Sequence, residues 1–183
     1  MLVWGVPLLL FAGPLELLML ASAILLHEGG HLFAFSLLGE PPPGLSAVAL
    51  GLTLDPRRPL PYRREAVIAL CGPLFNLLAA LPLLLVHDLP PPLRALGAIH
   101  LFSALSNLVP LKGTDGDLLL FDLSALLCPL AVADRIRVIA RLSASVLLLF
   151  FALRLLLFPG GGAALFLLAS LLFRALPANY GVK

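Results

Sequence analysis

The sequence contains few charged residues, at 12% of its 183 positions. Soluble globular domains carry about 25%. Hydrophobic residues supply 61% of the chain, and the mean hydropathy is +1.07. This balance excludes an ordinary soluble domain and is typical of integral membrane proteins, so we expect the lipid bilayer as a partner. The net charge of +2 is too small to predict a nucleic-acid partner.

Cysteine is also scarce, and the start of the chain lacks basic residues. Cys71 and Cys128 lie in or beside apolar runs and are far apart, which predicts free thiols rather than a disulfide framework. No Lys or Arg precedes the first apolar stretch, so the basic region that opens a signal peptide is missing. We therefore expect the apolar segments to remain in the mature protein.

Long apolar runs, interrupted by Pro and Gly, occupy most of the sequence. About 20 helical residues cross a hydrocarbon core of about 30 Å. The runs predict an all-α integral membrane protein with a bundle of five to six transmembrane helices. The predicted segments are residues 14–38, 62–86, 93–109, 136–158 and 163–176, with a short run at 2–12 whose crossing is left open.

One stretch has a different pattern. Across residues 45–54, large side chains such as Val48, Leu50 and Leu52 alternate with small ones, which predicts a strand. A polar turn follows at residues 55–59. The pattern predicts a small membrane-associated β-hairpin, and a plain surface loop is the alternative. An edge strand here would hold an unwound substrate by β-augmentation.

The basic residues predict the orientation of the chain in the membrane. Of the twelve Lys and Arg, ten fall on one side of the predicted spans and only Arg94 and Arg154 on the other. The basic side is expected to be cytoplasmic. The longest polar connection is short, so we expect one polytopic domain over residues 1–183, in the plasma (inner) membrane.

The sequence His27-Glu28-Gly29-Gly30-His31 is a His-Glu-x-x-His motif. Residues four apart lie on one face of a helix, so both imidazoles can reach one zinc ion, and the adjacent Glu28 can reach a metal-bound water. Two His and a Glu inside an apolar segment are energetically costly, which favours a functional site over a polar cluster at a helix end. The motif predicts one Zn²⁺ per chain, with Glu28 as the catalytic base.

Zinc in a catalytic site needs a third protein ligand. His87 and His100 are expected away from the cytoplasmic side. The Gly-rich turn after residue 109 faces that side and holds Asp115 and Asp117. Either carboxylate is a candidate from the pattern alone.

Three motifs together resemble the site-2 protease family of intramembrane zinc metalloproteases. Besides His27–His31, Asn107-Leu108-Val109-Pro110 with Asp115-Gly116 is similar to the family's Asn-x-x-Pro-x-x-x-x-Asp-Gly motif. The segment at residues 72–76 is similar to the family's Gly-Pro-x-x-Asn element. The resemblance covers the family core, residues 14–117, and leaves C-terminal helices at 118–183. The nearest subgroup is the compact, sporulation-type proteases that process a pro-sigma factor.

The resemblance implies a zinc-dependent endopeptidase that cleaves a membrane-embedded or membrane-tethered protein near the cytoplasmic side. It implies His27, His31 and Asp115 as zinc ligands, and Asn107 and Asn76 as substrate-positioning residues. For Asn76, a hydrogen bond between helices is an equal alternative.

Candidate substrates include a pro-sigma or anti-sigma factor, and a membrane regulatory partner would fit a chain without accessory domains.

This chain departs from the family at Asp117, where the family usually has glycine. The extra acid keeps Asp117 as the second candidate for the third ligand. Two other functions are compatible with the composition: a catalytically silent membrane scaffold of the same fold, and a zinc or proton transporter. Transport paths usually need polar residues along several spans, whereas here the ionisable groups cluster at one depth.

Overall fold

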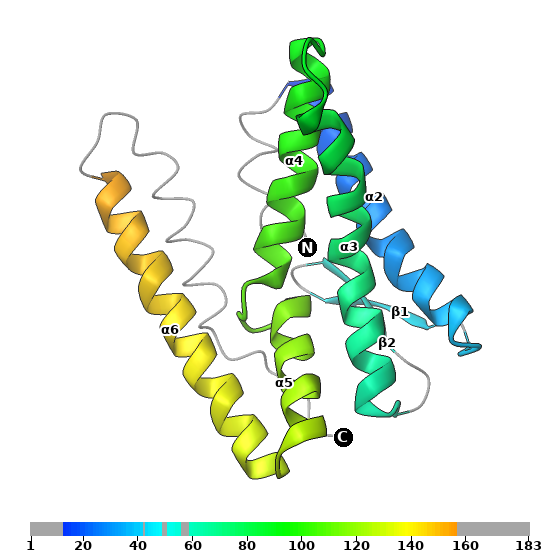
Figure 1. Cartoon of the computed structure of the whole chain (residues 1–183), viewed down its shortest axis with the longest axis vertical. Helices are drawn as coiled ribbons and strands as arrows, with labels where there is room; N and C mark the ends of the chain where they lie inside the picture. Colours follow the sequence, from blue (N-terminus) through cyan, green and yellow to red (C-terminus); the bar gives the residue numbers. More distant parts are fainter. Residues whose placement is uncertain (1–12, 42, 49–50, 56–58, 157–183) are drawn as a thin grey trace.

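The computed structural model describes residues 13–41, 43–48, 51–55 and 59–156. Five helices and two short strands make up this part of the chain (Figure 1). In chain order they are α2 (Pro14–Leu37), β1 (Gly44–Val48), β2 (Gly51–Asp55), α3 (Tyr62–Leu85), α4 (Pro91–Leu108), α5 (Asp115–Leu127) and α6 (Leu130–Leu156). The protein is mostly helical, as the sequence predicts.

Helix α2 begins and ends at residues that suit those positions. Pro14 occupies the first turn, where its missing N–H is not needed. At the other end, Gly39 has a φ of 65°, and the N–H groups of Gly39 and Glu40 donate to the carbonyls of Ser36 and Phe35 at 3.1 and 2.9 Å. This is a Schellman motif, which satisfies the last carbonyls of the helix.

Helix α3 lies at the centre of the bundle. It packs against α2, α4 and α5, and Figure 1 shows it between α2 and the column formed by α4 and α5. The interior prolines Pro73 and Pro82 predict irregularity, yet the helix runs unbroken from Tyr62 to Leu85. Neighbouring helices can support the backbone groups that a proline frees in a membrane bundle.

Small and polar side chains make up most of the interior, and most large apolar ones point outward. Ala23, Ala34, Ala80 and Ala104 are fully buried, whereas many Leu side chains are exposed. Small residues let helix backbones approach closely where lipid, rather than water, surrounds the bundle. The distribution fits a protein whose outer surface contacts acyl chains.

Three helices in the described ranges are long and apolar enough to cross a membrane. They are α2, α3 and residues 130–154 of α6. The predicted segments at residues 2–12 and 163–176 lie outside the described residues. The count of five to six transmembrane helices therefore stays a prediction.

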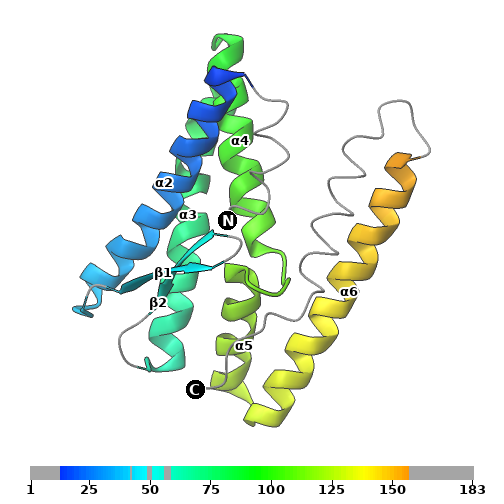
Figure 2. The ribbon, with the colours of Figure 1, turned by 180° about the vertical axis from the view of Figure 1, so that it is seen from behind.

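Strands β1 and β2 pair antiparallel, with Gly44 opposite Asp55 and Val48 opposite Gly51. The rear view shows this two-stranded sheet crossing in front of α3 (Figure 2). Each strand has one edge that is not used in the β1–β2 pairing. The association of this sheet with the membrane and its role in holding substrate stay predictions.

Helix α5 buries an acidic side chain at its contact with the bundle. Asp122 is fully buried, and neither carboxylate oxygen has a hydrogen-bond partner among the described residues. Burial and the charge of Glu65 on α3 raise the pKa of the Asp122 carboxyl to about 7, against the opposing charge of Arg137 on α6.

Replacing Asp122 by Asn should stabilise the protein in a pH-dependent way. The pKa is higher in the folded state than the ordinary value of 3.8, so wild-type stability falls as pH rises from about 4 to about 7 and then levels off. Thermal unfolding in detergent should show a larger gain for Asp122→Asn at pH 8 than at pH 5. The exposed Asp134→Asn is the control, and an equal gain at both pH values would contradict the assignment.

Candidate metal centre

Helix α2 presents His27 and His31 on one face toward α3 and α5. Their spacing of four residues places them one helical turn apart. His27 is 1% exposed and His31 8%. The two Nε2 atoms are 3.1 Å apart, and the ring planes are nearly perpendicular at 85°. The sequence prediction that both rings can reach one point therefore agrees with their arrangement in the fold.

The backbone of α3 sets the tautomer of His31. Its Nδ1 lies 2.8 Å from the carbonyl oxygen of Ile68. A carbonyl can only accept, so Nδ1 carries the proton and the neutral ring presents the lone pair of Nε2 toward the site. A hydrogen bond of this kind orients a metal-binding imidazole.

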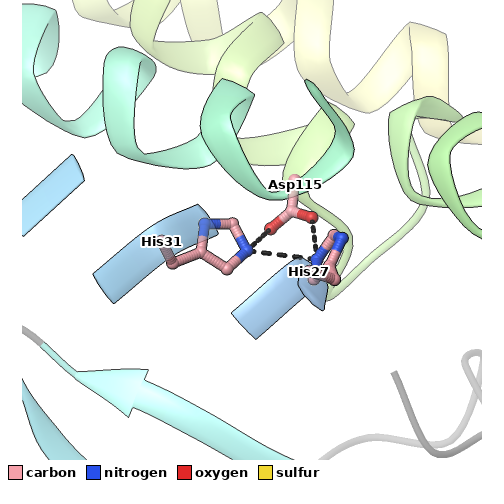
Figure 3. Close-up of side chains that lie close together, drawn as sticks. All are labelled: His27, His31 and Asp115. Atoms are coloured by element: carbon pink, nitrogen blue, oxygen red, sulfur yellow. Dashed lines mark hydrogen bonds and ion pairs between the residues drawn. The ribbon is translucent and has the colours of Figure 1, made fainter. Parts of the chain in front are cut away.

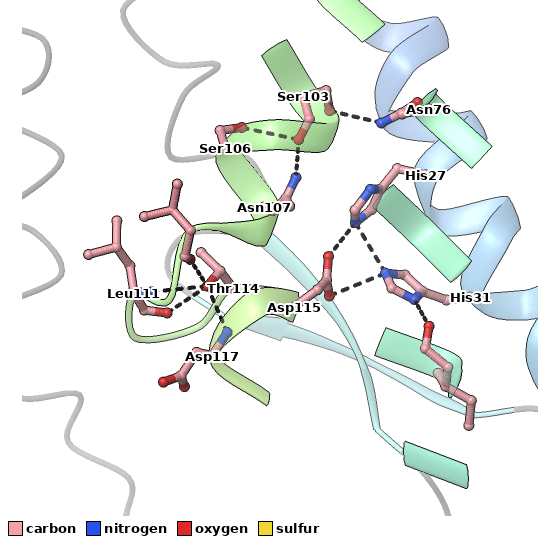
Figure 4. Close-up of polar contacts among 12 residues, drawn as sticks. His27, His31, Asn76, Ser103, Ser106, Asn107, Leu111, Thr114, Asp115 and Asp117 are labelled. Carbon is pink, nitrogen blue, oxygen red and sulfur yellow. Dashed lines mark hydrogen bonds and ion pairs between the residues drawn. The ribbon is translucent and has the colours of Figure 1, made fainter. Parts of the chain in front are cut away.

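The turn between α4 and α5 brings Asp115 to the histidines. Thr114 caps α5, because its hydroxyl accepts from the backbone N–H of Asp117 at 3.4 Å. The same hydroxyl accepts from the N–H of Leu111 and lies 2.7 Å from the carbonyls of Val109 and Leu111 (Figure 4). Gly113 has a φ of 81°, a left-handed conformation that glycine adopts without strain. Gly116 packs so closely on α4 that an added Cβ would lie 2.1 Å from the carbonyl oxygen of Leu108. The turn is therefore tightly specified.

Asp115 completes a compact cluster of three side chains (Figure 3). Its Oδ2 lies 2.9 Å from Nε2 of His27, and its Oδ1 lies 3.4 Å from Nε2 of His31. Burial alone would raise the pKa of the Asp115 carboxyl, but the contacts with His27 and His31 outweigh it and lower the pKa to about 2. The carboxylate is therefore ionised at neutral pH.

The donor set fits a zinc ion. Zinc–nitrogen bonds of about 2.0–2.1 Å in tetrahedral geometry hold ligand atoms about 3.3 Å apart. The three contacts here are 2.9, 3.1 and 3.4 Å. Two imidazoles and one carboxylate are also ordinary zinc ligands. His27, His31 and Asp115 are the one group of possible metal ligands found among the described residues.

Two glycines allow the helices to approach at this point. A Cβ on Gly72 of α3 would lie 2.4 Å from Nε2 of His31 and 2.9 Å from Cε1 of His27. A Cβ on Gly30 of α2 would lie 2.6 Å from the carbonyl oxygen of Cys71. Glycine at both positions is therefore required for the histidines to sit against α3.

Glu28 follows His27 on α2 and is half-buried. Its charge is close enough to act on the ring of His31. The role of Glu28 as the catalytic base stays a prediction.

Asn76 and Asn107, the two residues predicted to position the substrate, lie in a polar network close to the histidines (Figure 4). Asn76 of α3 is fully buried; its Nδ2 donates to Oγ of Ser103, and its Oδ1 is 2.9 Å from Nδ1 of His100. Asn107 is buried at the end of α4, and its Nδ2 donates to the carbonyl of Ser103. The bonds of Asn76 join α3 to α4, which agrees with the alternative of a hydrogen bond between helices. Sequence reasoning overlooked Ser103, which carries no motif.

Asp117, the second candidate for the third ligand, points away from the histidines (Figure 4). Its carboxylate instead pairs with Arg137 and Arg141 of α6. The structure therefore places Asp115, not Asp117, with His27 and His31.

No protein-family model and no curated protein sequence matches the chain. Among solved structures, a site-2 protease from Methanocaldococcus jannaschii is similar, with a TM-score of 0.62 and 20% sequence identity. The match covers 92% of this chain and 81% of that chain. The chain thus has a site-2 protease-like fold.

Replacing Gly72 or Gly30 by Ala should disrupt the cluster. The added methyl group must displace the histidines in one case and separate α2 from α3 in the other. Metal content of the purified protein, measured by inductively coupled plasma mass spectrometry, should fall in both variants.

Gly29→Ala is the matched control within the same motif, because its Cβ would meet nothing within 4 Å. It should retain full metal content. Equal metal content in all three variants would show that the close approach of α2 and α3 is not required.

Proposed function

We propose that the chain is a zinc-dependent intramembrane endopeptidase of the His-Glu-x-x-His type. The convergence of His27, His31 and Asp115 inside a bundle with a site-2 protease-like fold carries this proposal. Two helical elements more than 80 residues apart in sequence supply these donors, and all three are largely buried.

His27, His31 and Asp115 would hold one zinc ion per chain. When bound, zinc supplies a Lewis acid for the scissile carbonyl and lowers the pKa of a coordinated water toward 7. The protein contributes the fixed arrangement of donors, with the tautomer of His31 set by Ile68. His27 and His31 are buried, and limited contact with water strengthens electrostatic interactions at the site.

Glu28 acts as the general base. Its carboxylate takes a proton from the attacking water and returns it to the leaving amine. Its place next to His27 on α2 allows this role without a further element. Asn107 and Asn76 position the substrate or the segment that carries Asp115, through the buried network centred on Ser103.

The β1–β2 sheet offers a surface for the substrate backbone. A transmembrane helix must unwind before its peptide bonds can be cleaved, since its carbonyls are already hydrogen-bonded. Figures 3 and 4 both draw a strand of this sheet in the same field of view as His27, His31 and Asp115. A free strand edge can pair with an extended peptide and present it to the site.

The distribution of Lys and Arg favours an active site that faces the cytoplasm. We propose a multi-pass protein of the plasma membrane that forms one domain over residues 1–183. His27 lies ten residues before the end of α2, about 15 Å along the helix axis from the basic side. The substrate is a membrane-embedded or membrane-tethered protein, and a pro-sigma or anti-sigma factor is the candidate class. A membrane partner would regulate cleavage.

Glu28→Gln should abolish most cleavage while leaving the metal in place. General acid–base groups contribute about 10²- to 10⁴-fold to rates, and cleavage of a tethered substrate in proteoliposomes should fall by that factor. Zinc content should stay at one per chain. Cleavage at the wild-type rate would refute the mechanism.

Asp115→Asn should lower both zinc content and cleavage, because the neutral amide is a weaker zinc ligand than the carboxylate. Asp134→Asn, an exposed change on α6, should alter neither. Unchanged zinc stoichiometry in Asp115→Asn would move the third ligand elsewhere.

Zinc flux measured in the same vesicles separates a protease from a transporter. Tightly held zinc without flux or cleavage would identify a silent scaffold.

A further inference from the structure

Asp117 occupies the first turn of α5, two residues after Asp115. Residues two apart on a helix differ by about 200° in direction, so the two carboxylates point to opposite sides of α5. Figure 4 shows this divergence. Asp115 faces the histidines of α2, and the Asp117 side chain, 1% exposed, faces α6.

Two arginines saturate the Asp117 carboxylate. Nε and Nη2 of Arg137 donate to Oδ1 and Oδ2 at 3.1 and 2.8 Å. Nε and Nη2 of Arg141 donate to the same two oxygens, at 2.5 Å each. A carboxylate has about four lone-pair sites, and all of them are used here. Bidentate pairs fix orientation as well as distance.

The two arginines belong to α6. Without partners for these charges, inserting this helix into a membrane would cost free energy. Arg137 and Arg141 are one turn apart within the apolar span of α6. Charged groups in such a span need partners inside the protein. The guanidinium of Arg137 also lies 5.0 Å from the ring centroid of Phe121 on α5, a cation–π contact.

The α5–α6 junction connects α6 to the bundle. Within the described residues, the helix against which α6 packs most is α5, and both ribbon views show α6 apart from α2 (Figures 1 and 2). A force that moves α6 therefore reaches the bundle through the first turns of α5. That turn also holds Asp115, so a displacement of Asp117 moves the ligand carboxylate with it.

We propose that Asp117, paired with Arg137 and Arg141, is a positioning residue that fixes Asp115 in register with His27 and His31. The inference rests on the proposed zinc site. Thr114 anchors one side of the α5 N-terminus to the turn after α4, and Asp117 anchors the opposite side to α6. The ligand is held between these two anchors. The position of α6 thereby controls the geometry of the third ligand.

The test uses the full-length protein in detergent, with Co²⁺ as a spectroscopic substitute for zinc. Asp117→Asn keeps the shape of the side chain and removes the charge that holds both arginines. Co²⁺ affinity should fall about 10- to 100-fold, the usual cost of losing a group that orients a ligand. The visible d–d absorption should shift as the coordination geometry relaxes. In cleavage assays kcat should fall while KM changes little.

Further variants separate positioning from stability. Arg141→Gln leaves the Arg137 pair intact and should produce a smaller effect in the same direction. Asp117→Asn combined with Arg141→Gln should be no worse than Asp117→Asn alone. Arg135→Gln, an exposed change on the same helix, should match the wild type in affinity and spectrum.

The outcomes distinguish the two proposals. Co²⁺ bound by Asp117→Asn with wild-type affinity and spectrum, even with a lower unfolding temperature, would overturn the positioning role and leave the zinc site standing. A wild-type protein that binds no Co²⁺ or zinc would overturn both.

Discussion

The contact of one largely buried carboxylate with two buried imidazoles is the interaction on which the arrangement of this bundle depends. Asp115 lies 2.9 Å from His27 and 3.4 Å from His31, and no described element supplies these groups alone. Polar side chains of this kind are costly in an apolar interior unless they are paired or bind a metal. Helices α2, α3 and α5 are consequently held in one register, and an error of a few ångströms would leave charges buried without partners.

Glycines and backbone carbonyls make that register possible. Gly72 leaves the space that the histidines occupy, Gly30 lets α2 contact α3 at Cys71, and Gly116 lets α5 begin against the end of α4. These residues contribute nothing to chemistry directly. Each lacks a Cβ where two elements meet, and these close approaches together determine how far apart His27, His31 and Asp115 lie.

Polar groups away from the cluster of His27, His31 and Asp115 hold the helices that carry it. Asn76 joins α3 to Ser103 and His100 of α4, and Asp117 joins α5 to two arginines of α6. Hydrogen bonds and ion pairs of this kind are directional, so they specify how each helix is rotated about its axis as well as which helices are in contact. The apolar exterior, by contrast, tolerates many arrangements because lipid contacts are not directional. The few polar contacts therefore specify how the helices are arranged. Some of these residues also form the candidate metal site.

The sequence by itself predicted the helical class, the start and end of α2, and the location of the His27–His31 motif on one helix, because helical periodicity and apolar runs are local properties. It also singled out Glu28 as a candidate base. It also reduced the third ligand to two acids, Asp115 and Asp117, and the family resemblance favoured the first. Only the tertiary structure showed which acid lies with the histidines. The direction of each carboxylate depends on how α5 is rotated, and that rotation is set by α4, α6 and the turn capped by Thr114. The partners of Asp117 were equally inaccessible from the pattern, since Arg137 and Arg141 lie 20 and 24 residues away and were interpreted as flanking charges.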